Sequence, residues 1–289
     1  MTAPLAPEKR AARRAFDRAA TRYDEAAALQ QEVGRRLLEH LEPIAIQPAR
    51  IVDLGCATGA HLEPLARRYP RAKVIGIDVS QAMLARARLR APWWRRFAGG
   101  GPVLARADAE KLPLAAASCD FIFSNLTLHW CDPPSYFGEA ARALSTGGLL
   151  LFSTFGPDTL KELRAAFAAV DEAPHVHRFI DMHDLGDALV HAGFGDPVME
   201  MENITVEYRD VAAMVRELRD TGAANAWPGR RRGLMTPARW EGMTQRYEEL
   251  RRDGALPATC EIVYGHAWKA APSKTSDGRQ IIGFRARGA

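Results

Sequence analysis

A glycine-rich turn gives the first indication of chemistry in this sequence. Residues 51–59 read Ile-Val-Asp-Leu-Gly-Cys-Ala-Thr-Gly, and they lead from an apolar run into a turn before a helical pattern begins. Gly55 and Gly59 would let the backbone approach a ligand closely because they carry no Cβ. Ligands of parallel α/β sheets bind beyond the carboxyl ends of the strands, so this turn is a candidate nucleotide-binding site.

Two cofactors could use such a turn. A dinucleotide fingerprint needs glycine at three positions of the pattern G-x-G-x-x-G, and here they hold Gly55, Ala57 and Ala60. The turn typical of methyltransferases, D-x-G-x-G-x-G, fits better, because from Asp53 onward only its middle glycine is replaced, by Ala57. Taken alone, the segment also fits an ordinary strand-to-helix turn of another α/β protein.

Polar residues follow the next three apolar runs and narrow the choice. Asp78 ends the second run, Asp108 follows the third, and Asn125 follows the fourth. A carboxylate at Asp78 can accept both hydroxyls of a ribose, and one at Asp108 can accept an adenine amino group. Asp and Asn also start many turns. Their convergence on one edge of a predicted sheet nevertheless favours a nucleoside site.

Strand and helix patterns alternate around these residues. Apolar runs at 50–54, 74–77, 103–105, 121–123 and 148–153 alternate with helical patterns at 62–69, 82–89 and 135–144. Such an alternation indicates βαβ units with right-handed crossovers. Further on, we expect helices at 158–170 and 184–192, a strand at 198–208, helices within 209–257, and a last strand at 262–268. The predicted fold is a doubly wound α/β domain with a seven-stranded, mostly parallel sheet, N-terminal helices and a helical insertion before the last strand.

Length and composition are those of one globular unit. The chain has 289 residues, of which 47% are hydrophobic, so it can bury a core. We expect a single domain over 1–270, with its core at about 45–156, lid elements at 8–42, 155–183 and 209–257, and a loosely ordered tail at 271–289. No apolar run is as long as a membrane span, and Met1–Arg14 lacks the apolar region of a secretory signal, so we expect a cytoplasmic protein without membrane attachment. The net charge of +4 permits an acidic partner without choosing one.

Between about 49 and 155 the sequence resembles the class I S-adenosylmethionine-dependent methyltransferases. The resemblance implies that Asp53, Gly55 and Gly59 contact the methionine part of the cofactor, while Asp78 holds its ribose and Asp108 its adenine. The expected cofactor site is completed by their neighbours Cys56, Ala57, Val79, Ala109, Asn125 and Leu126.

A narrower resemblance covers nearly the whole chain. Residues 16–24 (Phe-Asp-Arg-Ala-Ala-Thr-Arg-Tyr-Asp) with Leu29-Gln30 are similar to the N-terminal helix of the malonyl-acyl carrier protein O-methyltransferases of biotin synthesis. The chain resembles the same family at five further segments, which are 125–130, 152–164, 174–179, 181–184 and 259–268. The resemblance implies methylation of the free carboxyl of a malonyl thioester, on acyl carrier protein or coenzyme A, to give the methyl ester that primes pimelate synthesis.

Two other functions stay open at this point. Residues 155–160, 219–225 and 257–268 also resemble the mitochondrial complex I assembly factors, which are linked to arginine hydroxylation and would act on a partner protein. A methyltransferase for another small acid or a quinone-like acceptor is the third possibility. The Tyr23-Asp24 segment favours the malonyl family.

A malonyl acceptor would place modest demands on the chain. Its carboxyl, with a pKa of roughly 3 to 4, is an anion at neutral pH and needs no general base. It needs in-line positioning and a positively charged partner, and an arginine can bind a carboxylate through two hydrogen bonds. We expect Arg178 in this role, although it could equally be a surface arginine. Tyr23 could close over the cofactor or simply pack in the core, and His129 could contact substrate or cap a strand end.

Other groupings carry weaker signals. The histidines at 175, 177, 183 and 191 lack the spacing of a metal motif, so we expect no metal. The run Arg230–Arg232, with Arg246, Arg251 and Arg252, could receive an acidic carrier protein or could be a solvated face. The Trp93-Trp94-Arg95-Arg96 segment is expected to be a packing patch rather than a nucleic-acid site. We expect a monomer.

Overall fold

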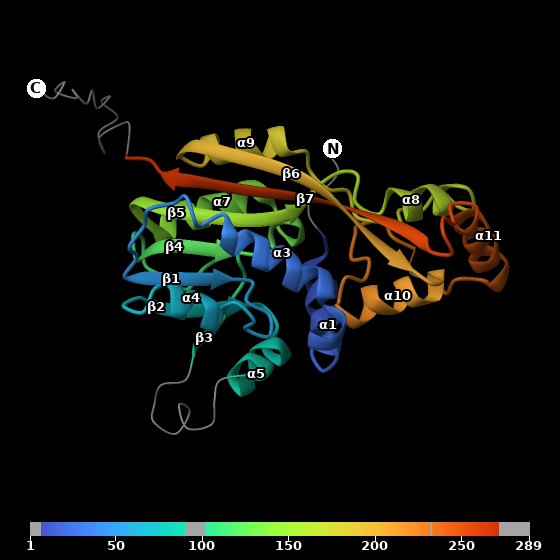
Figure 1. The fold of residues 1–289 in the computed structure, drawn as a ribbon, viewed down its shortest axis with the longest axis horizontal. Helices are drawn as coiled ribbons and strands as arrows, with labels where there is room; N and C mark the ends of the chain where they lie inside the picture. Colours follow the sequence, from blue (N-terminus) through green and yellow to red (C-terminus); the bar gives the residue numbers. More distant parts are fainter. Residues whose placement is uncertain (1–6, 91–101, 232, 272–289) are drawn as a thin grey trace, which may run out of the picture.

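Seven strands form one twisted sheet in a computed structural model that describes residues 7–90, 102–231 and 233–271 (Figure 1). Their order is β3-β2-β1-β4-β5-β7-β6. The first five are parallel, and β7 runs antiparallel between β5 and β6. Their bounds are β1 (Arg50–Leu54), β2 (Lys73–Asp78), β3 (Val103–Arg106), β4 (Cys119–Ser124), β5 (Leu144–Phe155), β6 (Phe194–Tyr208) and β7 (Leu256–Lys269). The predicted doubly wound, mostly parallel sheet is confirmed.

Helices cover both faces of the sheet, as alternating side chains of its strands require. In β1, Ile51 joins a core with Val33 and Leu37, whereas Val52 points to the opposite face and a core with Phe137. The helices beside the sheet are α3 (Ala28–Glu39), α4 (Leu62–Arg68), α5 (Gln81–Arg90), α7 (Pro133–Ala143) and α9 (Met182–His191), with a short 3-10 helix, η1, at Leu128–Trp130. The predicted helices at 62–69, 82–89, 135–144 and 184–192 correspond to α4, α5, α7 and α9.

The expected N-terminal helices within 8–42 are three in number. They are α1 (Lys9–Ala19), α2 (Tyr23–Ala26) and then α3. The backbone leaves the helical region at Ala27, with φ −87° and ψ 39°, although alanine itself favours helix. At this bend Asp24 accepts a hydrogen bond from the Thr58 hydroxyl (2.6 Å) and pairs with Arg90 (2.8 Å). Tertiary contacts with the glycine-rich turn therefore break the helix.

A long hairpin carries the helical insertion. β6 and β7 pair along most of their length, and the chain between them forms α10 (Val211–Asp220) and α11 (Pro237–Glu248). With α8 (Lys161–Ala168) these helices gather at one end of the hairpin, around a separate core that includes Phe167, Met243 and Tyr247 (Figure 1). The last strand begins at Leu256 rather than 262 because β6 offers a partner for each of its first residues.

No helix within 7–90, 102–231 and 233–271 is both long and apolar enough to cross a bilayer. The expected packing patch at 93–96 and nearly all of the expected tail lie outside the described residues.

Candidate functional site

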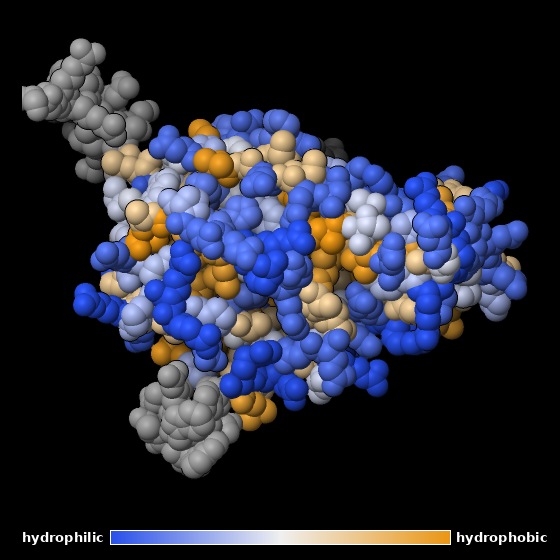
Figure 2. All heavy atoms as spheres, in the orientation of Figure 1, coloured by the Kyte–Doolittle hydropathy of each residue, from blue (hydrophilic) through white to orange (hydrophobic). Residues whose placement is uncertain are grey.

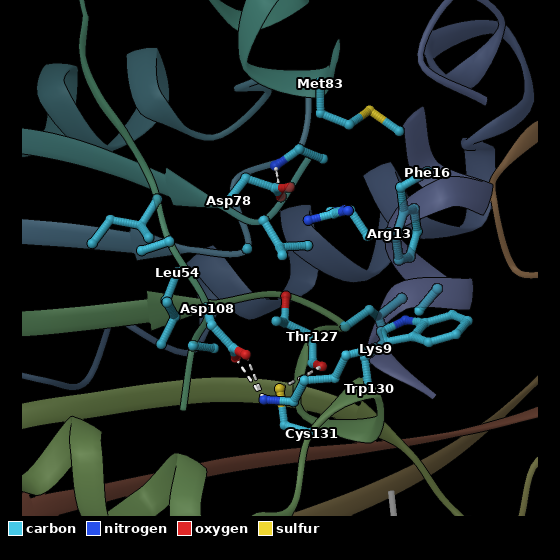
Figure 3. A pocket seen from close by; sticks show the side chains of 18 of the residues that line it. Lys9, Arg13, Phe16, Leu54, Asp78, Met83, Asp108, Thr127, Trp130 and Cys131 are labelled. Atoms are coloured by element: carbon cyan, nitrogen blue, oxygen red, sulfur yellow. Dashed lines mark hydrogen bonds and ion pairs between the residues drawn. The ribbon is translucent and has the colours of Figure 1, made fainter. Parts of the chain in front are cut away.

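A cavity of about 100 Å³ lies at the carboxyl ends of the parallel strands (Figure 3). The strand order reverses between β1 and β4, and residues that follow both strands line this strand-end cavity, including Gly55 and Asn125. Helix α1 borders it with Lys9, Arg13 and Phe16. The cavity therefore occupies the switch point, where doubly wound sheets bind their ligands.

The glycine-rich turn can approach the neighbouring loop only because Gly55 has no side chain. Its φ is +78°, and an added Cβ would lie 2.0 Å from Oγ1 of Thr127. Ala57, at the position where the motif has glycine, also takes a positive φ of 45°. Its N–H donates to Oδ2 of Asp78 (2.9 Å), which fixes the turn against the end of β2.

Asp78 and Asp108 both face the strand-end cavity, in different electrostatic settings. Asp78 accepts backbone hydrogen bonds from Ala57 and Ser80, yet burial raises the pKa of its carboxyl to about 6. Asp108 is bound by Lys9, whose Nζ lies 2.8 and 2.6 Å from its two carboxylate oxygens, as Figure 3 shows. Lys9 also pairs with Glu110 at 2.6 Å, so two ion pairs tie the start of α1 to the end of β3.

Asp53 is a buried carboxylate without a counterion. It is 1% exposed, and its Oδ2 has no hydrogen-bond partner among the described residues. Burial, together with the negative charge of Asp78, raises the pKa of Asp53 to about 8. A buried carboxylate without a partner is costly, and a ligand with an ammonium group would relieve that cost. This environment fits S-adenosylmethionine, which carries such a group beside its sulfonium.

Most of the predicted cofactor residues meet at this cavity. Its lining includes Tyr23, Gly55, Ala57, Asp78, Val79, Asp108, Ala109, Asn125 and Leu126. Asp53 and Gly59 are absent from the lining, and Cys56 faces a neighbouring cavity of about 30 Å³ that Tyr23 and Asn125 also line. Gly59 instead packs near Leu62 and Ala87.

Other lining residues were missed at the sequence level. They come from α1, α5 and the loop after β4, and they are Lys9, Ala12, Arg13, Phe16, Met83, Thr127, Trp130 and Cys131. The N-terminal helix was expected to form a lid, but no motif in it distinguishes a cavity-facing lysine from an exposed one. Only the helical spacing of Lys9, Ala12, Arg13 and Phe16 could have suggested a common face.

A second, larger cavity of about 410 Å³ adjoins the first at Trp130, which lines both. Six phenylalanine, tyrosine and tryptophan side chains line this large cavity, among them Phe155, Phe179 and Trp240. His129 faces it rather than the strand-end cavity, and its ring lies against Phe155 and Phe179. Burial holds the pKa of His129 well below its usual range, so the imidazole is neutral at physiological pH.

Two of the four clustered histidines also line the large cavity, and each is held by its own partner. His177 accepts a hydrogen bond from the N–H of Ala226, and burial lowers its pKa to about 4. His175 stacks on Phe167 and bonds to Asp171. The described residues contain no group of three or more side chains placed to hold a metal ion.

The structure places Arg178 away from both of these cavities. It is exposed and lines only a small cavity of about 10 Å³, on the other side of His129 and Phe179. The large cavity is lined instead by Arg219, Arg230 and Arg231. Arg230 pairs with Glu8 (2.9 Å), whereas Arg219 has no ion pair or side-chain hydrogen bond with another described residue. The arginines that line the large cavity therefore differ from the one expected from sequence, and the role of Arg178 stays a prediction.

Comparison with known proteins agrees with this geometry. The methyltransferase-domain family matches residues 52–152. The chain is 53% identical to a malonyl-[acyl-carrier protein] O-methyltransferase of Gallionella capsiferriformans, over 95% of this chain and 96% of the relative. It is 48% identical to one of Laribacter hongkongensis, over 98% of both chains.

Solved structures share the fold at much lower identity. The YcgJ protein of Bacillus subtilis superposes with a TM-score of 0.58 at 14% identity, covering 82% of this chain and 99% of that one. The [4+2]-cyclase SpnF superposes with a TM-score of 0.60 at 19% identity, covering 93% and 99%. The second neighbour is named for a cyclisation, so the fold by itself does not decide the reaction.

The fold, the strand-end cavity and the matched domain together define a class I S-adenosylmethionine-dependent methyltransferase. Within that class, the identity over nearly the full length of both chains places this one in the malonyl-[acyl-carrier protein] O-methyltransferase family.

The close approach at Gly55 predicts a specific sensitivity. We expect Gly55→Ala to weaken S-adenosylmethionine binding at least ~10-fold and to destabilise the fold by about 1–3 kcal/mol beyond the cost of its positive φ, because Cβ overlaps Thr127. Gly147→Ala is the matched control, since Gly147 has φ +76° with nothing within 4 Å. Titration calorimetry and chemical unfolding would measure both effects. Equal losses of stability in the two variants would contradict the overlap.

The raised pKa values of the two buried carboxyls predict a pH-dependent affinity. Below about pH 8 Asp53 is largely protonated in the free protein, and a ligand with an ammonium group favours the ionised form. Affinity should therefore increase as the pH rises from 6 to 8, by roughly tenfold or more. Calorimetry with S-adenosylhomocysteine in two buffers of different ionisation enthalpy would detect the proton released. An affinity that does not change over this range, in wild type as in Asp53→Asn, would rule the linkage out.

Proposed function

We propose that this protein transfers the methyl group of S-adenosylmethionine to the free carboxylate of malonyl-acyl carrier protein, giving the malonyl methyl ester that primes pimelate synthesis for biotin. The observation that carries the proposal is the meeting of two cavities at Trp130. One lies where the fold binds its cofactor, and the other is large enough for an acyl thioester. Relatives at 48–53% identity that bear this activity in their names support the choice of acceptor.

The residues around the strand-end cavity would hold the cofactor. Asp53 is suited to the ammonium group and Asp78 to the ribose hydroxyls. Asp108 is suited to the adenine amino group, which would share its carboxylate oxygens with Lys9. S-adenosylmethionine supplies a methyl group activated by its positively charged sulfur. Tyr23 borders both this cavity and the small one beside it, which suits a residue that covers the methionine end.

The residues around the large cavity need only to position the acceptor and to exclude water. A malonyl carboxylate is already ionised at neutral pH, so no residue has to remove a proton from it. The aromatic lining displaces water, which strengthens electrostatic contacts within the cavity. The neutral imidazole of His129 has a buried Nδ1 without a hydrogen-bond partner in the described part of the chain, and a polar group of the substrate would satisfy it. Such a site suits an acceptor that is already nucleophilic.

A lid over both cavities is part of the proposal. Helix α1 borders the strand-end cavity, while residues of 155–183 and 209–257 line the large one. The backbone N–H of Glu8 donates to the carbonyl of Ala226 (2.8 Å), so the N-terminal segment and the insertion already touch. Closure of these elements would keep water from the methyl group during transfer.

Labelled S-adenosylmethionine would test the acceptor directly. Purified protein should label malonyl-acyl carrier protein and leave acetyl-acyl carrier protein unlabelled, because only the first has a free carboxylate. Malonyl-coenzyme A in a parallel reaction would show whether the carrier matters. Absence of transfer to every malonyl thioester, in protein that binds the cofactor, would refute the proposed function.

Arg219 is our candidate for the partner of the malonyl carboxylate. Losing a hydrogen bond to a charged group costs about 1.5–3 kcal/mol, so Arg219→Ala should lower kcat/KM for malonyl-acyl carrier protein roughly 10- to 150-fold. Arg178→Ala, in the position expected from sequence, serves as the matched comparison and should stay within about twofold. Cofactor affinity measured on both variants reports their folding. A larger loss in Arg178→Ala would reverse the assignment.

A further inference from the structure

Helix α1 presents two chemically distinct faces. Its buried face consists of Ala12, Ala15 and Ala19. Arg10, Arg14 and Arg18 are all exposed and recur every four residues, so they form one stripe along the helix. At 1.5 Å per residue the stripe is about 12 Å long. Figure 2 shows hydrophilic residues over α10, and hydrophilic residues mixed with apolar ones over α1.

These arginines lack counterions within the described chain. None of the three forms an ion pair or a side-chain hydrogen bond with another described residue. Arg216 on the neighbouring helix α10 forms none either, although its charge helps to lower the pKa of Asp210 at the start of that helix. The acidic side chains of the two helices are engaged elsewhere: Asp17 accepts from Ser80, Glu217 from Tyr208, and Asp220 pairs with Arg22. We call these four arginines the arginine face. The three on α1 carry positive charges that no described residue balances through an ion pair, and Arg216 extends the same charge onto α10.

The arginine face lies beside the large cavity. Its helix runs along residues 219–231, which contribute much of the cavity lining. Phe16 approaches Gly222, and Glu8 at the start of the helix pairs with Arg230. At its other end, Arg22 meets Asp220, and Arg216 lies one turn from Asp220 on α10. A partner seated on this face would stand next to the cavity that receives its acyl group.

We infer that the arginine face of α1 and α10 is the docking surface for the acyl carrier protein, an acidic partner. The inference rests on the proposed function and deepens it by assigning the surface that receives the carrier. Unopposed charges of one sign at the rim of a site accelerate association with an oppositely charged partner. The sequence left open whether the run Arg230–Arg232, with Arg246, Arg251 and Arg252, receives the carrier or is a solvated face. In the structure Arg230 pairs with Glu8, Arg246 with Glu249 and Arg251 with Glu248, so we place the docking surface elsewhere.

Charge reversal on α1 tests the surface without touching either cavity. We expect Arg14→Glu/Arg18→Glu to bind malonyl-acyl carrier protein at least tenfold more weakly and to raise its KM similarly, with cofactor affinity unchanged. The matched control is Arg71→Glu, an exposed arginine before β2, at the amino ends of the parallel strands and away from α1 at their carboxyl ends, and it should bind as wild type does. Raising the salt concentration should weaken binding by the wild type and affect the double variant much less.

Binding is measured by surface plasmon resonance without turnover, so this test stays separate from that of the proposed function. Unchanged carrier affinity in the double variant, or equal loss in Arg71→Glu, would overturn the docking surface even if methyl transfer proceeds. If the glutamates disrupt α1, cofactor affinity will fall as well, and Arg14→Gln/Arg18→Gln then replaces them with a smaller expected loss of about threefold. Salt-independent binding by the wild type would also overturn the inference.

Discussion

The absence of a side chain at Gly55 is the constraint on which the site depends. The turn after β1 lies so close to Thr127 that a methyl group would overlap its side chain. The N–H groups of Gly55 and Cys56 both donate to the carbonyl of Ile77, at 2.8 and 3.0 Å, and that of Ala57 donates to Asp78. The turn is thereby fixed between the ends of β2 and β4, and its contact with Asp78 holds that carboxylate at the cavity.

The same packing makes the site electrostatically unfavourable without a ligand. Asp53 and Asp78 are buried near one another, and their mutual repulsion adds to the desolvation that raises the pKa of Asp53. Asp108 escapes this situation because Lys9 neutralises it from α1. Asp53 and Asp78, near the turn, therefore have no cationic partner among the described residues, whereas Asp108, near β3, is paired with Lys9. S-adenosylmethionine, which is cationic at its methionine end and neutral at its adenine end, matches this difference between the carboxylates.

Sequence reasoning succeeded wherever a local pattern determines the outcome. Strands such as β1 were predictable because buried parallel strands are short apolar runs, and Gly55, Asp78 and Asp108 were predictable because each follows one. The break at Ala27 was not, since it arises from the contacts of Asp24 with Thr58 and Arg90 across the fold. The position of Arg178 outside the large cavity was unpredictable for a similar reason. Its neighbours His177 and Phe179 line the large cavity, but adjacent residues in an irregular segment point in different directions.

Helix α1 joins two functions that the fold otherwise keeps apart. One side of it contributes Lys9, Arg13 and Phe16 to the strand-end cavity, and Phe16 also packs edge-on against Trp130 where the two cavities meet. Its exposed side carries arginines that the protein does not neutralise. A carrier held on that side would restrain the helix, and a restrained helix opens less often over the cofactor. Carrier docking and closure over the cofactor would then favour one another, because both involve helix α1.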